Sequence, residues 1–122
     1  MSTHKQQLGK EGEDIASAHL ISKGYKILAR NYRSGHAELD IVAMYDDLLI
    51  IVEVKTRETS KYGNPEEAVG TGKINMLAQA TEDYMIEKDM NCNVRYDIIS
   101  IIKNQYKTEV THLEDAFWPG LY

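Results

Sequence analysis

The stretch AELDIVAMYDDLLIIVEVK, residues 37–55, is the most informative part of this chain about its fold. It has the pattern of two strands joined by a short turn. Residues 37–44 and 48–55 are rich in aliphatic and β-branched side chains, which favour strands. The polar break Tyr45-Asp46-Asp47 between them is typical of a turn. The second arm is apolar at successive positions, which indicates a strand buried on both faces. The stretch therefore predicts a β-hairpin inside a sheet.

Acidic side chains from the two arms of this hairpin are expected to meet. A turn centred between the arms places Asp40 opposite Glu53, and Glu38 opposite Lys55. Because side chains alternate faces along a strand, all four project from the same side of the sheet. Two carboxylates held opposite each other repel, unless a cation lies between them. Oxygen ligands from two strands, beside an ammonium group, fit a Mg²⁺ site for phosphate chemistry.

A second interpretation is that these charged residues form the solvated face of a hairpin. Glu38 and Lys55 would then be a surface ion pair, which contributes little to stability. The position of Glu53 weighs against this interpretation, because it interrupts a strand that is otherwise apolar on both faces. A carboxylate in such a strand is costly without a partner. The sequence leaves both interpretations open.

The composition is that of a globular protein with one domain, residues 1–122, of which 43% are hydrophobic and 27% charged. No apolar run approaches the roughly 20 residues that span a bilayer, and the N-terminus lacks a secretory signal. A single cysteine, Cys92, excludes an internal disulfide, so a cytoplasmic location is expected. The net charge of −5 argues against a general nucleic-acid-coating protein, but the active-site carboxylates of a nuclease are themselves negative.

Periodicity predicts helices and strands in a fixed order. The expected elements are a helix over 5–23, a strand over 25–32, the hairpin, a helix ending near 88, a strand over 94–102 and a further strand around 106–112. The second helix has candidate starts at Pro65 or, because Gly70 and Gly72 weaken it, near Thr71 or Lys73. Such a helix returns the next strand parallel to the one before it. We therefore expect an α/β fold with a mixed central sheet flanked by helices on its two faces.

The first helix brings a further acidic residue toward the sheet. Its apolar stripe includes Leu20, and Glu13 lies in a neighbouring row that borders the buried face. Gly9 and Gly12 leave room for another backbone or a phosphate to approach closely. Glu13 is either an additional ligand or a carboxylate flanking an amphipathic helix, and its spacing alone favours the second reading.

An ordered set of motifs runs from the first helix to the fourth strand. It comprises Gly9-Lys10-Glu11-Gly12-Glu13-Asp14-Ile15-Ala16, Gly24-Tyr25, Asn31-Tyr32-Arg33, Glu38-Leu39-Asp40-Ile41-Val42-Ala43, Val52-Glu53-Val54-Lys55-Thr56-Arg57, Lys73 and Arg95-Tyr96-Asp97. With the element order above, this set resembles the YraN-like family of bacterial proteins, within the PD-(D/E)xK (restriction endonuclease-like and Holliday-junction resolvase-like) superfamily. The resemblance covers nearly the whole chain. It implies a restriction endonuclease-like core of helix, three strands, helix and one or two strands.

By this resemblance the chain is a metal-dependent nuclease that hydrolyses phosphodiester bonds of DNA, branched DNA included. Asp40, Glu53 and Glu13 match the metal-binding acids, and Lys55 matches the lysine beside the attacking water. The implied cofactor is Mg²⁺ or Mn²⁺. Lys55 is expected to stay charged, because the carboxylates around it favour the ammonium form. One departure is Ala37, where the family usually has glycine, so the preceding turn is expected to have a different shape.

Three basic residues after the hairpin are candidates for substrate binding. Arg57 and Lys61 follow the third strand and Lys73 lies at the start of the second helix, where they are placed to contact backbone phosphates. For Lys73 an ordinary helix-surface position is equally compatible with the sequence. The resemblance implies a nucleic-acid partner and no membrane, and it is compatible with a homodimer that cuts two strands symmetrically.

Two other functions are consistent with the same residues. One is a nucleic-acid-binding or protein-interaction module that keeps the nuclease fold without cleaving. The other is a structural partner protein that assembles through the apolar residues 117–122. Neither predicts a loss of activity on replacing Asp40 or Glu53, which separates them from the nuclease.

Overall fold

The computed structural model describes residues 3–59 and 70–119. The elements are α1 (His4–Ser22), β1 (Lys26–Ser34), β2 (Ala37–Tyr45), β3 (Leu48–Arg57), α2 (Thr71–Glu87), β4 (Asn93–Lys103) and β5 (Thr108–Leu113). The predicted order is confirmed, and the fourth and fifth strands are both present. The candidate helix start at Pro65 lies outside the described residues, and the described helix begins at Thr71, the later of the predicted starts.

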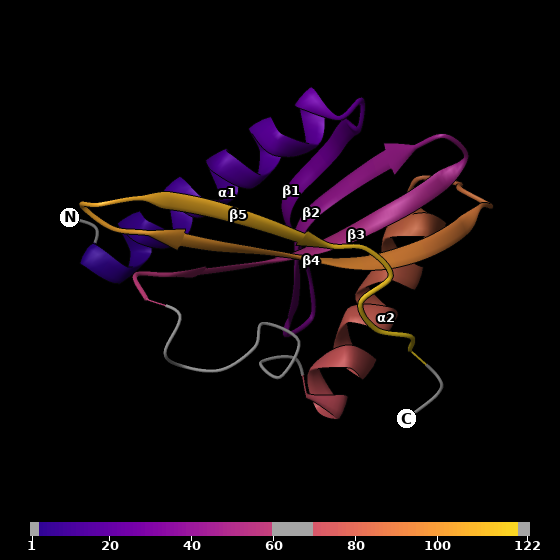
Figure 1. Cartoon of the computed structure of the whole chain (residues 1–122). Coiled ribbons are helices and arrows are strands. Elements are labelled where there is room, and N and C mark those ends of the chain that lie inside the picture. Colours follow the sequence, from indigo (N-terminus) through magenta and orange to yellow (C-terminus); the bar gives the residue numbers. More distant parts are fainter. Residues whose placement is uncertain (1–2, 60–69, 120–122) are drawn as a thin grey trace.

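The five strands form one sheet in the order β1-β2-β3-β4-β5 (Figure 1). Neighbouring strands are antiparallel except β3 and β4, which are parallel, so the sheet is mixed as predicted. The hairpin has the predicted register, because Tyr45 pairs with Leu48 and Ile41 with Val52. Its turn residue Asp46 has a φ of +53°, a conformation that Asp tolerates in two-residue hairpin turns. Ala37 takes an ordinary strand position opposite Ser34.

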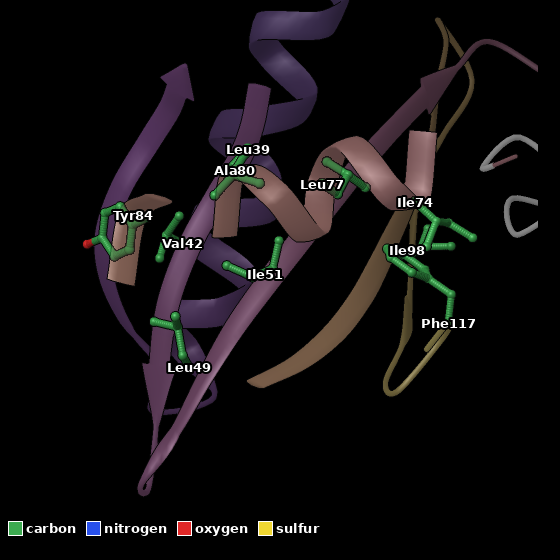
Figure 2. Close-up of a cluster of buried hydrophobic side chains, with 10 residues drawn as sticks. All are labelled: Leu39, Val42, Leu49, Ile51, Ile74, Leu77, Ala80, Tyr84, Ile98 and Phe117. Atoms are coloured by element: carbon green, nitrogen blue, oxygen red, sulfur yellow. The ribbon is translucent and has the colours of Figure 1, made fainter. Parts of the chain in front are cut away.

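The helices lie on opposite faces of the sheet (Figure 1). Alternation along the strands sends one set of side chains to α1 and the other to α2. The α1 face has Ala16 and Leu20 of the helix buried against the strand residues Ile41, Ala43, Ile50, Val52, Ile99 and Ile101. The α2 face has Ile74, Leu77, Ala80 and Tyr84 of the helix packed on Leu39, Val42, Leu49, Ile51 and Ile98 (Figure 2). This double coverage explains why β3 is apolar at successive positions.

Helix α1 approaches the end of β3 closely at Gly12. A Cβ atom at this position would lie 1.8 Å from Oγ1 of Thr56, so no side chain fits there without a shift. Gly9, one turn earlier, would place a Cβ with nothing within 4 Å. At Gly12 the close approach therefore involves the Thr56 side chain, and not the backbone or phosphate that the sequence predicted. It brings the first half of α1, including Glu13, beside the strand that carries Glu53 and Lys55.

The segment after β5 returns to the sheet. The Ala116 N–H donates to the Tyr96 carbonyl at 2.7 Å, and the Phe117 ring is buried in the α2-side core (Figure 2). Phe117, the first of the apolar residues 117–122, therefore docks on the core of its own chain. Among the described residues, no helix is both long enough and apolar enough to cross a bilayer.

Candidate active site

The site lies where β2 and β3 separate. Their paired register ends at Ile41 and Val52, one step before Asp40 and Glu53. Beyond that point the Asp40 carboxylate takes the place of a backbone partner, because its Oδ2 accepts a hydrogen bond from the Val54 N–H at 2.9 Å. The N–H and C=O of one strand residue point to the same neighbour, so the Val54 carbonyl also faces this opening. Asp40 is thereby fixed in orientation by the strand that carries Glu53.

Glu53 is the most deeply buried charge of the site. Its side chain is 5% exposed, and its Oε1 contacts Nζ of Lys73, which reaches in from the first turn of α2. The same Oε1 lies 3.5 Å from Nζ of Lys55. Two ammonium groups therefore share one carboxylate oxygen. A buried carboxylate without such partners would be strongly destabilising.

The carboxylates of Asp40 and Glu53 converge rather than pointing to opposite sides of the sheet. Both line a cavity of about 220 Å³ that is bordered by His36, Glu38 and Lys73. Both also line a second cavity of about 310 Å³, which the remaining site residues from α1 and β3 share: Lys5, Leu8, Gly9, Glu13, Val54, Lys55 and Thr56. The gap between the strands thus makes one pair of carboxylates reachable from the α1 side and from the α2 side.

Burial and charge perturb the ionisation of this cluster. Burial, together with the negative charge of Glu53, raises the pKa of Asp40 from 3.8 to about 7, although the Val54 N–H opposes the rise. Burial lowers the pKa of Lys55, and the neighbouring Lys73 ammonium lowers it further. Glu53 and Asp40 act to raise the pKa of Lys55, as expected, but burial and Lys73 outweigh them. Burial also acts to lower the pKa of Lys73, but its contact with Glu53 outweighs this and raises it.

Glu13 lies at the edge of the site. Its side chain is 19% exposed and borders the larger cavity with Asp40 and Glu53, and its charge contributes to the raised pKa of Asp40. Its Oε1 lies 3.6 Å from the Arg30 guanidinium, which also holds Asp14 at 2.8 Å. Within residues 3–59 and 70–119, no three His, Cys, Asp or Glu side chains form a group that would hold a metal ion. The protein side of the site therefore centres on two carboxylates.

The predicted substrate-binding residues have different positions. Arg57 is the last residue of β3 and is partly buried. Lys61 lies outside the described residues. Lys73 is neither a plain helix-surface residue nor a peripheral cation, because it contacts Glu53 directly. The expected partnership of Glu38 with Lys55 is wrong, because Glu38 instead lies 3.4 Å from Arg33 on the neighbouring strand, while Lys55 turns to Glu53.

A second polar cluster, around Asp97, was not predicted. Asp97 is fully buried, and its carboxylate accepts two hydrogen bonds from Arg95, at 2.9 and 2.8 Å. The His112 ring contacts Oδ2 at 2.7 Å, and the Asp115 N–H donates to Oδ1 at 3.0 Å. The Arg95 guanidinium also donates to the Tyr25 hydroxyl at 2.7 Å. The motif Arg95-Tyr96-Asp97 was visible in the sequence, but its partners lie 15 to 70 residues away along the chain.

Fold and site together define the class of protein. It is an α/β protein whose mixed five-stranded sheet, covered by one helix on each face, is consistent with an endonuclease-like core. Residues 12–101 match the family described as "Uncharacterised protein family UPF0102". The chain belongs to this family, and the YraN-like resemblance is confirmed.

Relatives of the same family match the chain from end to end. A UPF0102 protein of Phocaeicola vulgatus is 43% identical over 122 residues, which covers 100% of both chains. A UPF0102 protein of Christiangramia forsetii is 44% identical over 118 residues, covering 97% of this chain and 98% of the relative. A third, from Syntrophotalea carbinolica, is 41% identical over 118 residues, or 96% of each chain. The whole described fold, including both polar clusters, therefore falls within the matched region.

Proposed function

We propose that this protein is a metal-dependent nuclease that hydrolyses phosphodiester bonds of DNA, branched DNA included. The observation that carries the proposal is the convergence of Asp40 and Glu53 where β2 and β3 separate, with two lysines on the same carboxylate. Opposed carboxylates repel each other and therefore have a strong affinity for cations. A site of this charge pattern suits phosphoryl chemistry, in which negative charge builds on oxygen atoms.

The donor atoms fit Mg²⁺ or Mn²⁺. Asp40, Glu53 and the Val54 carbonyl supply hard oxygen ligands, and Glu13 lies across the same cavity. Two carboxylates are sufficient for Mg²⁺, which keeps several waters and takes further oxygens from substrate phosphates. When bound, such an ion would lower the pKa of a water and offset the charge of the transition state. The group of two carboxylates therefore favours an ion that is held jointly by protein and substrate.

The lysines have separate tasks in this proposal. Lys55, two residues after Glu53 and one quarter exposed, points an ammonium donor into the α1-side cavity. From there it orients the attacking water and donates hydrogen bonds to the phosphate oxygens. Its lowered pKa also makes it a better proton donor than an ordinary lysine. We propose that Arg57, at the end of the same strand, contacts a backbone phosphate of the substrate.

The proposed partners are DNA and a second copy of this chain. DNA is the proposed substrate, and a homodimer would place two sites for symmetric cleavage of two strands. We infer a cytoplasmic protein, since bacterial DNA is found there. The net charge of −5 limits non-specific binding, so recognition is expected to depend on the site itself and on DNA shape.

A second candidate is a binding module that retains the nuclease fold without cleaving. It is favoured by the contact between Lys73 and Glu53, which already neutralises the deepest carboxylate. In that protein the two lysines and two carboxylates would be a permanent structural network. It predicts low affinity for Mn²⁺ and no dependence of any activity on Asp40.

Cleavage assays separate the two candidates. Purified protein is mixed with four-way-junction, single-stranded and duplex DNA in Mg²⁺ or Mn²⁺, alongside Asp40→Asn and Lys55→Ala. The nuclease predicts cleavage by the wild type and a loss of at least about 100-fold in each variant, since each removes a group at the reacting phosphate. Glu38→Gln is the matched control, because Glu38 borders the same cavity but pairs with Arg33. Equal cleavage by all four proteins would reveal a contaminating nuclease. If no DNA is cleaved and calorimetry detects no binding of Mn²⁺, the binding module is favoured.

A further inference from the structure

We propose that Lys73 is the counter-cation of Glu53 in the metal-free site, and that it leaves Glu53 for a phosphate of the nucleic acid when a divalent ion binds. This inference rests on the proposed function and names the residue that couples metal binding to substrate binding. Lys73 would thus be a substrate-binding residue whose availability depends on the metal.

Glu53 is more deeply buried than Lys73, as the exchange requires. The Glu53 side chain is 5% exposed and belongs to a strand inside the sheet, so its carboxylate cannot move far. The Lys73 side chain is 41% exposed and lies along the mouth of the α2-side cavity. A lysine has a flexible four-carbon stem, so its ammonium can leave while the backbone stays in place.

The helix holds the backbone of Lys73 fixed. Ile74 and Leu77, the residue after it and one turn further on, are 4% and 2% exposed and pack into the core beneath α2 (Figure 2). Helical geometry therefore sets the position from which the Lys73 side chain extends. The exchange needs a change of side-chain rotamers and no movement of the helix.

The charges of the site favour this exchange. Without metal, Asp40 and Glu53 face Lys55 and Lys73, so two carboxylates meet two ammonium groups. A divalent ion adds two positive charges, and Glu53 cannot serve the ion and both lysines through one buried oxygen pair. A phosphodiester offsets part of this excess positive charge by supplying negative oxygens to the released ammonium. Metal and nucleic acid should therefore bind cooperatively through Lys73.

A static ion pair is the competing explanation for the contact. In that case Lys73 only stabilises the buried Glu53, and its removal would weaken metal binding by disturbing the site. The exchange predicts the reverse, because removing a competing cation frees Glu53. The sign of the change in metal affinity thus distinguishes the two explanations.

Calorimetric titration with Mn²⁺ at pH 8 supplies the first test. We expect Lys73→Met to bind Mn²⁺ about tenfold more tightly than the wild type, and Lys73→Arg to bind no more tightly, because it keeps the competing charge. Lys103→Met is the matched control: Lys103 is 35% exposed and lies 3.0 Å from Glu11, so the same charge is lost away from the site. Melting temperatures with and without Mn²⁺ verify that each variant is folded. Equal or weaker Mn²⁺ affinity in folded Lys73→Met would overturn the inference.

Binding of a fluorescent duplex oligonucleotide, measured by anisotropy, supplies the second test. A Lys55→Met background prevents cleavage, and Lys73→Met is added to it. We expect Mn²⁺ to tighten oligonucleotide binding in the Lys55→Met protein and to have at least about fivefold less effect in the double variant. The same Mn²⁺ effect in both proteins would overturn the exchange. Mn²⁺ binding that is absent from every protein, Lys73→Met included, would instead contradict the proposed function.

Discussion

Asp40 is a residue whose ionisation is costly in the metal-free protein. Its pKa is raised to about 7 by burial and by Glu53, whereas in an unfolded chain it is near 3.8. The folded state therefore binds the proton more tightly, and the free energy of unfolding falls as pH rises from about 4 to about 7. Function rather than stability accounts best for a carboxylate at this position.

This leads to a prediction for Asp40→Asn. The amide keeps an oxygen that accepts the Val54 N–H but cannot ionise. In EDTA at pH 8 the variant should have a free energy of unfolding about 1–2 kcal/mol above the wild type, and at pH 4 a nearly equal one. Urea unfolding at the two pH values measures both. A variant less stable than the wild type at pH 8 would show that ionised Asp40 stabilises the fold through its lysine neighbours.

At the residue scale, the sequence predicted that the carboxylates of Asp40 and Glu53 meet, but not that Lys73 contacts Glu53. The hairpin register, which predicts that Asp40 and Glu53 meet, depends only on a two-residue turn and on alternation along the strands. The contact of Lys73 with Glu53 depends on the position of α2 along the sheet, and no local sequence pattern specifies that position. The lowering of the Lys55 pKa was missed for a related reason, since burial is set by the packed helices rather than by neighbours in the sequence.

At the scale of elements, the contact between α1 and β3 positions the α1 side of the site. Gly12 permits this contact, because a Cβ there would meet the Thr56 side chain at 1.8 to 2.9 Å. Thr56 directly follows Lys55, so a displacement of α1 would be transmitted to the candidate active site. The absence of a side chain at position 12 is therefore a structural requirement for this contact.

The two glycines of α1 give a matched pair of variants. Gly12→Ala should lower the free energy of unfolding by about 2 kcal/mol, because the clash with Thr56 exceeds the gain in helix propensity. Gly9→Ala should raise it by about 0.5–1 kcal/mol, since its Cβ would meet nothing within 4 Å. Thermal or urea unfolding compares them. Equal effects of the two substitutions would show that the close approach of α1 to β3 does not persist in solution.

At the scale of the whole molecule, the Asp97 cluster joins segments that are distant in sequence. It links Tyr25, which lies between α1 and β1, with strand β4, His112 of β5 and the returning C-terminal segment at Asp115. Burial alone would raise the pKa of Asp97, but hydrogen bonds from His112, Arg95 and the Asp115 N–H lower it below 3.8. The ionised carboxylate therefore stabilises the fold above pH 3.8, and this contribution is lost as pH falls through the lowered pKa.

Replacing Asp97 should be among the most destabilising single changes. Asp97→Ala leaves Arg95 and the Asp115 N–H without their acceptor, so we expect a loss of about 3–5 kcal/mol at pH 7. Glu114→Gln is the control, because Glu114 is 51% exposed at the rim and should change stability by less than about 1 kcal/mol. The difference between wild type and Asp97→Ala should shrink below pH 3.8. A difference that is constant from pH 7 to pH 2.5 would exclude the ionised form as its source.

Local patterns in the chain were enough to predict the order of the elements, the mixed sheet and the meeting of two carboxylates across a hairpin. These depend on local periodicity, turn chemistry and the short connections between neighbouring strands, all of which act over a few residues. Three contacts do not follow from such local patterns: Lys73 with Glu53, Glu38 with Arg33, and the Asp97 cluster, in which Arg95 donates to Tyr25, 70 residues away. Those contacts arise from how the two helices and the chain end pack on the sheet, and packing depends on the shapes of all the buried side chains at once.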